Sequence, residues 1–171
     1  ETTQNYSVSE ITPSDSTAEI IRKVVSSTTT AVTDIRNILT EEAVEKCVNA
    51  ILGSKLVYMF GVGASAYIAG DLYHKINRLG VRAVTDSNEQ MIALHSAHFD
   101  SNDTVFLVSH SGESSSILES AQLARKNGAR VCAITSYANS TLANRAECVL
   151  LSSSSETTYR PDADRKSTRL N

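Results

Sequence analysis

Short apolar runs that do not alternate with polar residues constrain the fold of this chain more than any other feature. Four such runs cover residues 56–60, 104–108, 130–134 and 148–151, and a weaker fifth covers 81–84. Continuous runs of this length are typical of strands buried on both faces, as in a parallel sheet. Helical spacing lies between them, at about 65–79, 88–98, 115–127 and 140–146. This alternation predicts an α/β fold in which a five-stranded parallel sheet is flanked by helices.

Two further helices are expected before the first run. Ser16-Thr17-Ala18-Glu19 matches a capping box, in which the two polar side chains satisfy backbone amides at a helix start. The second helix would begin after Thr40 as N-cap and end at Gly53, where we expect the left-handed conformation. The first helix carries an apolar seam of 3.5-residue period, which packs either on its own domain or on a partner chain. The seam residues are Ile21, Val25, Thr28, Val32, Ile35 and Leu39.

These patterns divide the chain into one domain with a segment at each end. Residues 1–15 are polar and contain Pro13, which is typical of a linker or tail. The domain is expected over 16–151, with a helical part at 16–53 and an α/β core at 55–151. Residues 152–171 begin with four serines and end in what resembles the start of a further helix, so we expect a tail.

Composition excludes several classes of protein. The 16 basic residues against 19 acidic ones leave a net charge of −3, which disfavours nucleic-acid binding by the whole chain. No apolar run reaches the length of a membrane span, and the N-terminus lacks the apolar centre of a signal peptide. Three cysteines, Cys47, Cys132 and Cys148, are an odd number without metal-ligand spacing. We therefore expect buried free thiols in a reducing cytoplasm, no disulfide framework and no metal site.

Two loops that follow apolar runs carry glycines or hydroxyls. The segment Gly61-Val62-Gly63-Ala64-Ser65-Ala66 follows the first run, and the segment Ser109–Ser116 contains up to five serine hydroxyls at the start of a helix. In an open parallel sheet, ligands bind at the carboxyl ends of the strands. Hydroxyls together with the unpaired amides of a helix N-terminus can hold a phosphate without a fixed cation. The alternative is a serine-rich loop with a single N-cap, but the pairing of two such loops favours phosphate binding.

The two loops give the sequence a family resemblance. Gly-x-Gly-x-Ser65 followed 44 residues later by Ser109-x-Ser-Gly-Glu-Ser resembles a sugar isomerase (SIS) domain. More narrowly, residues 10–151 resemble the C-terminal effector domain of RpiR-family bacterial transcriptional regulators. The segment Glu10-Ile-Thr-Pro-Ser-Asp-Ser is similar to that family's linker, and Val57 to Gly80 is similar to its first strand–helix unit.

The resemblance implies a flavodoxin-like three-layer sandwich that binds a phosphorylated sugar or amino sugar and needs no cofactor. It implies that the phosphate is held by Ser65, Ser109, Ser111 and Ser114, with His110 lining the same loop. We add Gly63, Ala64 and Glu89 to the candidate ligand-binding residues. It also implies a homodimer or larger assembly, and DNA binding only through an N-terminal helix-turn-helix domain that is absent ahead of residue 1. The seam of 21–39 would then transmit the ligand signal.

An aldose–ketose isomerase is the competing hypothesis, because that reaction requires a positioned base. The candidates are Glu89, His95, His110 and Glu113, although Glu89 fits a helix cap next to Asp86 or Ser87 better. The isomerases that act on arabinose 5-phosphate carry, by resemblance, a lysine at the place of Ala64 and a His-Pro near Thr85, and this chain has neither. His95 and His98 have the spacing of a metal pair, but nothing completes the ligand set. We therefore expect a non-catalytic sensor; a structural interaction module would leave both loops unexplained.

Overall fold

The computed structural model describes residues 11–152. The chain divides into two compact units, one made of residues 1–36 with 153–171 and the other of residues 37–152. The predicted tails therefore fall largely outside the described residues.

Helix α1 (Thr17–Ile38) makes up most of the described part of the first unit. The predicted capping box is confirmed, because the Glu19 N–H donates to Ser16 Oγ at 3.3 Å and the Ser16 N–H donates to Glu19 Oε2 at 2.8 Å. No residue of α1 is buried, and Ile21, Val25 and Val32 of the apolar seam are each more than half exposed.

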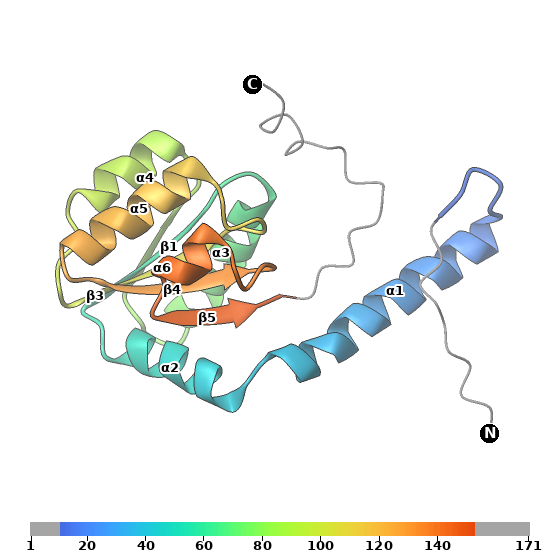
Figure 1. The fold of residues 1–171 in the computed structure, drawn as a ribbon, viewed down its shortest axis with the longest axis horizontal. Coiled ribbons are helices and arrows are strands. Elements are labelled where there is room, and N and C mark those ends of the chain that lie inside the picture. The colour runs from blue at the N-terminus through green and yellow to red at the C-terminus, as the bar shows by residue number, and fades with distance from the viewer. Residues whose placement is uncertain (1–10, 153–171) are drawn as a thin grey trace. The chain divides into compact units, whose positions relative to one another are not determined.

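The second unit is built on a five-stranded sheet whose strands all pair in parallel (Figure 1). The strand order is β2-β1-β3-β4-β5, which confirms the predicted fold. The strands are β1 (Leu56–Gly61), β2 (Ala83–Asp86), β3 (Asp103–Val108), β4 (Arg130–Thr135) and β5 (Cys148–Leu151). The prediction for β2 was two residues early, because the Val81 N–H still bonds to Ile76 O at the end of the preceding helix.

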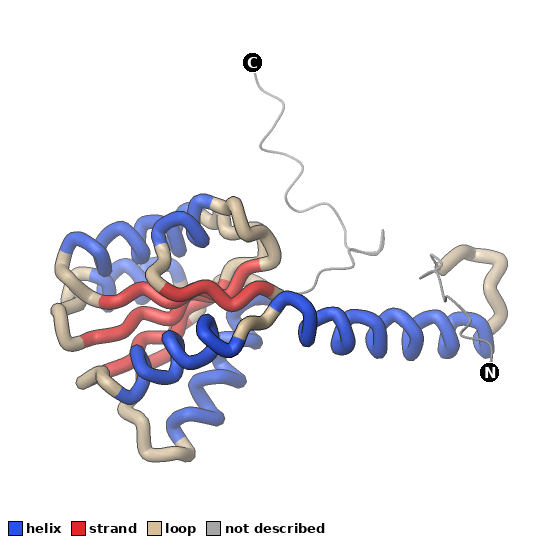
Figure 2. Tube along the Cα trace, turned by 60° about the horizontal axis from the view of Figure 1, so that its bottom comes forward, coloured by secondary structure: helices blue, strands red, loops and turns tan. Residues whose placement is uncertain are grey.

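Helices cover both faces of this sheet (Figures 1 and 2). They are α2 (Glu41–Leu52), α3 (Ala64–Asn77), α4 (Glu89–Ser96), α5 (Ser115–Lys126) and α6 (Thr141–Arg145). One apolar core lies between the sheet and α4, α5 and α6, and contains Phe60, Leu107 and Ile117. A second core lies between the sheet and α2 and α3, and contains Met59 and Phe106. Because both faces are covered, the inner strands are mostly apolar and buried on both sides, which is why their sequences do not alternate.

The ends of α2 agree with the predicted cap and differ at the predicted terminator. Thr40 Oγ1 accepts a hydrogen bond from the Ala43 N–H at 3.2 Å, as expected of an N-cap. Gly53 ends the helix, but its φ of −85° is not left-handed. A Cβ there would lie 3.1 Å from Asn49 O and 3.2 Å from the Arg130 guanidinium. Glycine at this position gives room to Asn49 O and the Arg130 side chain, and its backbone angles are open to other residues.

The prediction of three free thiols was wrong for two of them. Cys47 on α2 and Cys148 on β5 form a disulfide across 101 residues of sequence. The two cysteines are far apart in the sequence, so the sequence alone did not predict the disulfide. The folded sheet places its edge strand β5 next to α2. Cys132 is a free, buried thiol, as expected. Burial raises its pKa to about 12, so the thiol is neutral at physiological pH.

Within the part of the chain that the structure describes, no helix combines the length and the apolar character that a membrane crossing requires.

Candidate functional site

The two loops singled out in the sequence start side by side at the carboxyl edge of the sheet. Strands β1 and β3 are neighbours, and their last paired residues are Gly61 and Val108. The glycine loop leaves β1 at that point and the serine loop leaves β3 at the same level. The strand order reverses here, because β1 has β2 on one side and β3 on the other. In open α/β sheets this is where ligands bind.

The first loop is a tight turn into α3. A Cβ at Gly61 would lie 2.6 Å from Ser65 O, so only glycine allows the helix to start this close to the strand. Gly63 is the N-cap of α3 with a φ of +57° and offers no side chain there. Ala64 is exposed, and Ser65 is half-buried in the first turn. The loop therefore presents small residues and helix N-terminal amides to the space above the sheet.

Ser109, at the start of the second loop, points into the loop itself. Its side chain accepts a hydrogen bond from the Gly112 N–H at 3.1 Å, and its N–H donates to Ile134 O at 3.0 Å. Only 4% of the residue is exposed. Ser109 thus fixes the course of the loop, and its direct contact with a ligand stays a prediction.

Ser111 and Ser114 are half-buried further along the loop. Ser111 Oγ accepts a hydrogen bond from the Glu113 N–H at 3.2 Å. Ser114 is the N-cap of α5, yet its side chain makes no capping hydrogen bond. Its hydroxyl is therefore able to turn toward a ligand, beside the amides that the first turn of α5 leaves unpaired.

A third loop, which the sequence analysis missed, supports the second. It follows β4 and carries Thr135, Ser136 and Ser140. Thr135 Oγ1 donates to His110 O at 3.1 Å, and Ser136 Oγ lies 2.9 Å from His110 Nδ1. His110 is thereby turned toward this loop, where its ring also meets Tyr137 edge-on at 5.8 Å. The sequence pattern that indicated the second loop also holds for this one, because it too follows a buried strand and is rich in hydroxyls.

Gly112 joins the second loop to α6. Its φ is +70°, and a Cβ there would overlap the side chain of Ser140 and lie 3.0 Å from Thr135 Oγ1. Its carbonyl accepts a hydrogen bond from the Leu142 N–H at 3.0 Å. The loop therefore packs backbone-to-side-chain against the start of α6, which fixes its shape before any ligand binds.

Glu113 adds a charged link to the same helix. Its carboxylate accepts a hydrogen bond from the Thr141 N–H at 2.6 Å. This backbone hydrogen bond, a further bond from Thr141 and the charge of Arg145 lower the pKa of Glu113 below its ordinary value of 4.5. The carboxylate lies at the N-terminus of α6, a helix of five residues, and acts as a clamp.

The clamp predicts a pH-dependent contribution to stability. A pKa that is lower in the folded chain means that ionised Glu113 stabilises the fold at neutral pH, and that this contribution is lost as the pH falls below 4.5. We expect Glu113→Gln to lower the free energy of unfolding at neutral pH by at most about 1 kcal/mol, since the group is exposed. Urea unfolding at neutral pH and at about pH 3 should show this difference disappearing in acid. Glu119→Gln, at an exposed carboxylate of α5, is the control; an equal pH-dependent loss there would contradict the clamp.

Glu89 is not the helix cap that the sequence favoured. Asn88 caps α4, because its side chain accepts hydrogen bonds from the Gln90 and Met91 N–H groups. Asp86 Oδ1 accepts from the two amides that follow it in the chain. The Glu89 carboxylate instead accepts a hydrogen bond from Ser116 Oγ at 3.3 Å. Glu89 therefore lies against the first turn of α5, next to the serine loop.

The remaining candidate for a catalytic base is His95, which has structural partners. His95 stacks on Phe60 with ring centroids 5.8 Å apart, and its Nε2 lies 3.9 Å from Asp86 Oδ2. His98 Nδ1 lies 2.9 Å from Leu94 O of the preceding helix, so the two histidines do not converge as a metal pair. Among the described residues, the group of His, Cys, Asp or Glu close enough to share an ion is Cys47, Cys132 and Cys148, away from the loops.

One protein-family model matches most of this chain. The SIS domain model matches residues 50–163, which include the sheet, helices α3 to α6 and all three loops. The chain belongs to the SIS domain family. The recognition made from the two loop motifs is thereby confirmed.

Several curated relatives of this SIS domain are HTH-type transcriptional regulators, and others are bifunctional glk proteins of Paraburkholderia and Burkholderia. An uncharacterised HTH-type transcriptional regulator of Thermotoga maritima is 30% identical over 154 residues, covering 90% of this chain and 55% of the relative. The HTH-type transcriptional regulator RpiR of Escherichia coli K12 is 26% identical over 149 residues, covering 87% and 50%. The chain thus spans about half the length of these two regulators.

Solved SIS structures share the fold. The sugar isomerase domain of an RpiR transcription factor from Sphaerobacter thermophilus superposes with a TM-score of 0.78 at 23% identity, covering 82% of this chain and 79% of that one. Vibrio vulnificus NanR, complexed with ManNAc-6P, gives 0.78 at 22%, covering 82% and 53%. A candidate sugar-phosphate isomerase from Listeria monocytogenes gives 0.71 at 21%, covering 83% and 76%.

Proposed function

We propose that this SIS domain binds a phosphorylated sugar or amino sugar at its three loops and serves as the sensor of an RpiR-type regulator in the bacterial cytoplasm. The observation that carries the proposal is the pairing of the Gly61–Ser65 and Ser109–Ser114 loops at one sheet edge. The regulator part rests on the HTH-type relatives, and the DNA-binding part of such a protein lies outside the SIS domain.

The chemistry of the site suits a phosphate dianion. The first turn of α5 offers unpaired amides, and the positive dipole ends of α3 and α5 both lie at this edge of the sheet. In α3 the Ser65 and Ala66 N–H groups already bond to Val62 O and Gly63 O. Ser65, Ser111 and Ser114 supply hydroxyls that can donate to phosphate oxygens, while Ser109 and Gly112 hold the loop in shape. Gly63 and Ala64 let a ligand approach the backbone closely, and His110 lines the far side of the loop. Carboxylates repel phosphate, so the Glu89 side chain would face the hydroxyls or the amino group of the sugar.

Signal transmission requires two arrangements with different affinities for the ligand, because a ligand shifts an equilibrium only by its differential affinity. We propose that the sensor works as a homodimer or larger assembly and that the seam of α1 contacts a partner chain. Its exposed Ile21, Val25 and Val32 would be covered in that assembly. X-ray scattering of a full-length regulator with and without ligand tests this, and superimposable profiles would contradict it.

The proposal predicts that a phosphosugar raises the melting temperature. A ligand at one hundred times its dissociation constant adds about 2.7 kcal/mol, which corresponds to a rise of roughly 5–10 °C for a domain of this size. The screen uses differential scanning fluorimetry with aldose and ketose phosphates and with amino sugar phosphates such as ManNAc-6P. Inorganic phosphate is the control for the phosphate group of the ligand, and the unphosphorylated sugars are the control for its sugar.

The paired variant Ser65→Ala with Ser114→Ala should abolish this rise while changing the unliganded melting temperature little, because neither hydroxyl has a capping role. Ser101→Ala, at an exposed serine away from the loops, is the matched control and should keep the whole rise. If no phosphosugar shifts the unmutated protein, or if the paired variant responds fully, the site is wrong.

An isomerase is the second candidate, favoured by the proximity of His95 to Asp86 at the carboxyl end of β2. A histidine beside a carboxylate could move a proton between adjacent carbons of a bound sugar. Incubation with aldose and ketose phosphates followed by product analysis separates the two functions. A sensor leaves every substrate unchanged, and turnover that is lost in His95→Gln would establish the enzyme.

A further inference from the structure

The three cysteines, which the proposed function does not use, form one cluster. Cys47 comes from α2, Cys132 from β4 and Cys148 from β5, and their sulfur atoms all lie within 4.8 Å of one another. All three residues are buried in the core between the sheet and α2 and α3. Strands β4 and β5 pair Cys132 directly with Cys148, so the sheet register itself places two of the sulfurs together.

The disulfide between Cys47 and Cys148 carries much of the attachment of α2. Only Cys47 and Ala50 of this helix are buried. Of its other large apolar residues, Val44, Val48 and Leu52 are 40%, 45% and 71% exposed, and Ile51 is half-buried against the same core. A helix with so small a buried face depends strongly on a covalent link to the sheet.

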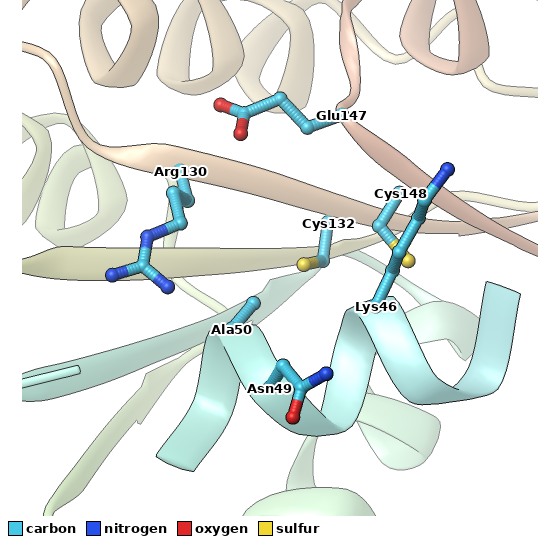
Figure 3. A pocket seen from close by; sticks show the side chains of 7 residues that line it. All are labelled: Lys46, Asn49, Ala50, Arg130, Cys132, Glu147 and Cys148. Carbon is cyan, nitrogen blue, oxygen red and sulfur yellow. The ribbon is translucent and has the colours of Figure 1, made fainter. Parts of the chain in front are cut away.

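Two members of this cluster, Cys132 and Cys148, line a cavity. This cavity is half-open and has a volume of about 330 Å³, and Figure 3 shows the sulfurs of Cys132 and Cys148 on the side of the strands that faces α2. The cavity also carries the cationic side chains of Lys46 and Arg130, which favour the approach of an anionic thiolate. Its lining residues are Lys46, Asn49, Ala50, Arg130, Cys132, Glu147 and Cys148.

We propose that Cys47 and Cys148 form a reversible oxidation site, whose disulfide fastens α2 to β5 and whose reduction releases the helix. Both states fit the site, because Cys148 Sγ lies 3.1 Å from Ala43 O and a reduced thiol there has its acceptor in place. The proposal is independent of the phosphosugar site, which lies at the carboxyl edge of the sheet.

The chemistry balances with a dithiol as reductant and hydrogen peroxide as oxidant. A dithiol thiolate attacks Cys148 Sγ from the cavity, the protein disulfide breaks, and its electron pair and a proton go to Cys47 Sγ. The second thiolate of the dithiol then closes its own disulfide and leaves Cys148 reduced. In the reverse direction, hydrogen peroxide oxidises one thiol to a sulfenic acid and releases water. The other thiol condenses with the sulfenic acid, forming the disulfide and a second water.

Cys132 provides an internal control. Its thiol is close enough to exchange with the pair, but burial raises its pKa to about 12, so it contributes almost no thiolate for the attack. The disulfide is therefore expected to stay between Cys47 and Cys148.

The test counts thiols and measures stability on the whole chain in both redox states. After oxidation with hydrogen peroxide, iodoacetamide labelling of the unfolded chain should add one label, on Cys132; after dithiothreitol it should add three. Reduction should lower the melting temperature by on the order of 5–15 °C and speed amide exchange in residues 41–52. Cys132→Ser should keep both responses, and Cys148→Ser should lose both.

Several results would overturn the proposal. They are three labelled thiols after oxidation, a disulfide that includes Cys132, and a disulfide that resists millimolar dithiothreitol. A reduced chain that melts at the same temperature as the oxidised one would contradict the proposal that the disulfide fastens α2 to β5. One equivalent of zinc bound to the three thiols of the purified protein would also contradict it.

Discussion

Replacing Gly112 with alanine is expected to lower the free energy of unfolding by about 2–5 kcal/mol and the melting temperature by roughly 5–15 °C. Two costs add. The φ of +70° is unfavourable for any residue with a Cβ, and that Cβ would overlap the Ser140 side chain that caps α6. Ser140 cannot move away without giving up its hydrogen bond from the Ala143 N–H. Thermal and urea unfolding measure the effect.

Gly63→Ala is the matched control for this prediction. Gly63 has a similar positive φ of +57°, but a Cβ there would meet nothing within 4 Å. It should therefore cost only the backbone part, about 1–3 kcal/mol, since its ψ of −132° lies outside the left-handed helical region. Equal losses at the two glycines would mean that Gly112 does not pack against α6. We also expect Gly112→Ala to weaken phosphosugar binding, because the loop would no longer be held in its binding shape.

Truncating Leu107 to alanine is expected to cost about 2–5 kcal/mol, because it leaves a cavity in the middle of the sheet. Leu107 lies on the central strand β3, is wholly buried, and packs in the core under α4, α5 and α6. The residue also stands two positions before Ser109, so the loss should reach the serine loop. Denaturant unfolding should show a lower midpoint with an unchanged slope.

Leu94→Ala makes the same chemical change on the outer side of α4, where the side chain is 54% exposed. Its cost should stay below about 0.5 kcal/mol, as is usual for surface positions. A loss at Leu107 as small as the loss at Leu94 would mean that β3 is not the central buried strand.

Both predictions bear on the proposed ligand site, whose serine loop is held in shape by contacts within the protein. Ser109, Gly112 and Glu113 each use their polar groups on the protein itself and hold the serine loop against β4 and α6. The groups left to a ligand at the proposed site are the hydroxyls of Ser65, Ser111 and Ser114 and the unpaired amides at the start of α5. A ligand that meets a fixed loop spends less binding free energy on ordering it.

The proposed oxidation site would link the stability of this domain to redox state at a different place in the fold. Helix α2 follows directly after α1, the helix that we propose contacts a partner chain. Oxidation would therefore hold α2 more rigidly against the sheet. The loops of the proposed phosphosugar site would not be affected.

The amino-acid sequence by itself determined the strands, the helices and the two loops that follow β1 and β3. Residues 104–108 and 56–60 are strands because a continuous apolar run of that length must be buried on both faces, and this is a local property that can be read without the fold. The capping box at Ser16 and Glu19 and the cap at Thr40 are equally local.

Only the tertiary structure decided which of these parts meet. The strand order β2-β1-β3-β4-β5 turns His110 toward Ser136, clamps Glu113 on Thr141 and brings Cys148 under Cys47. It also decided that the Ser109 hydroxyl accepts a hydrogen bond within its own loop and that Asn88 rather than Glu89 caps α4. Contacts between distant residues depend on which strands become neighbours, and hydrophobic periodicity within a segment carries no information about its neighbours.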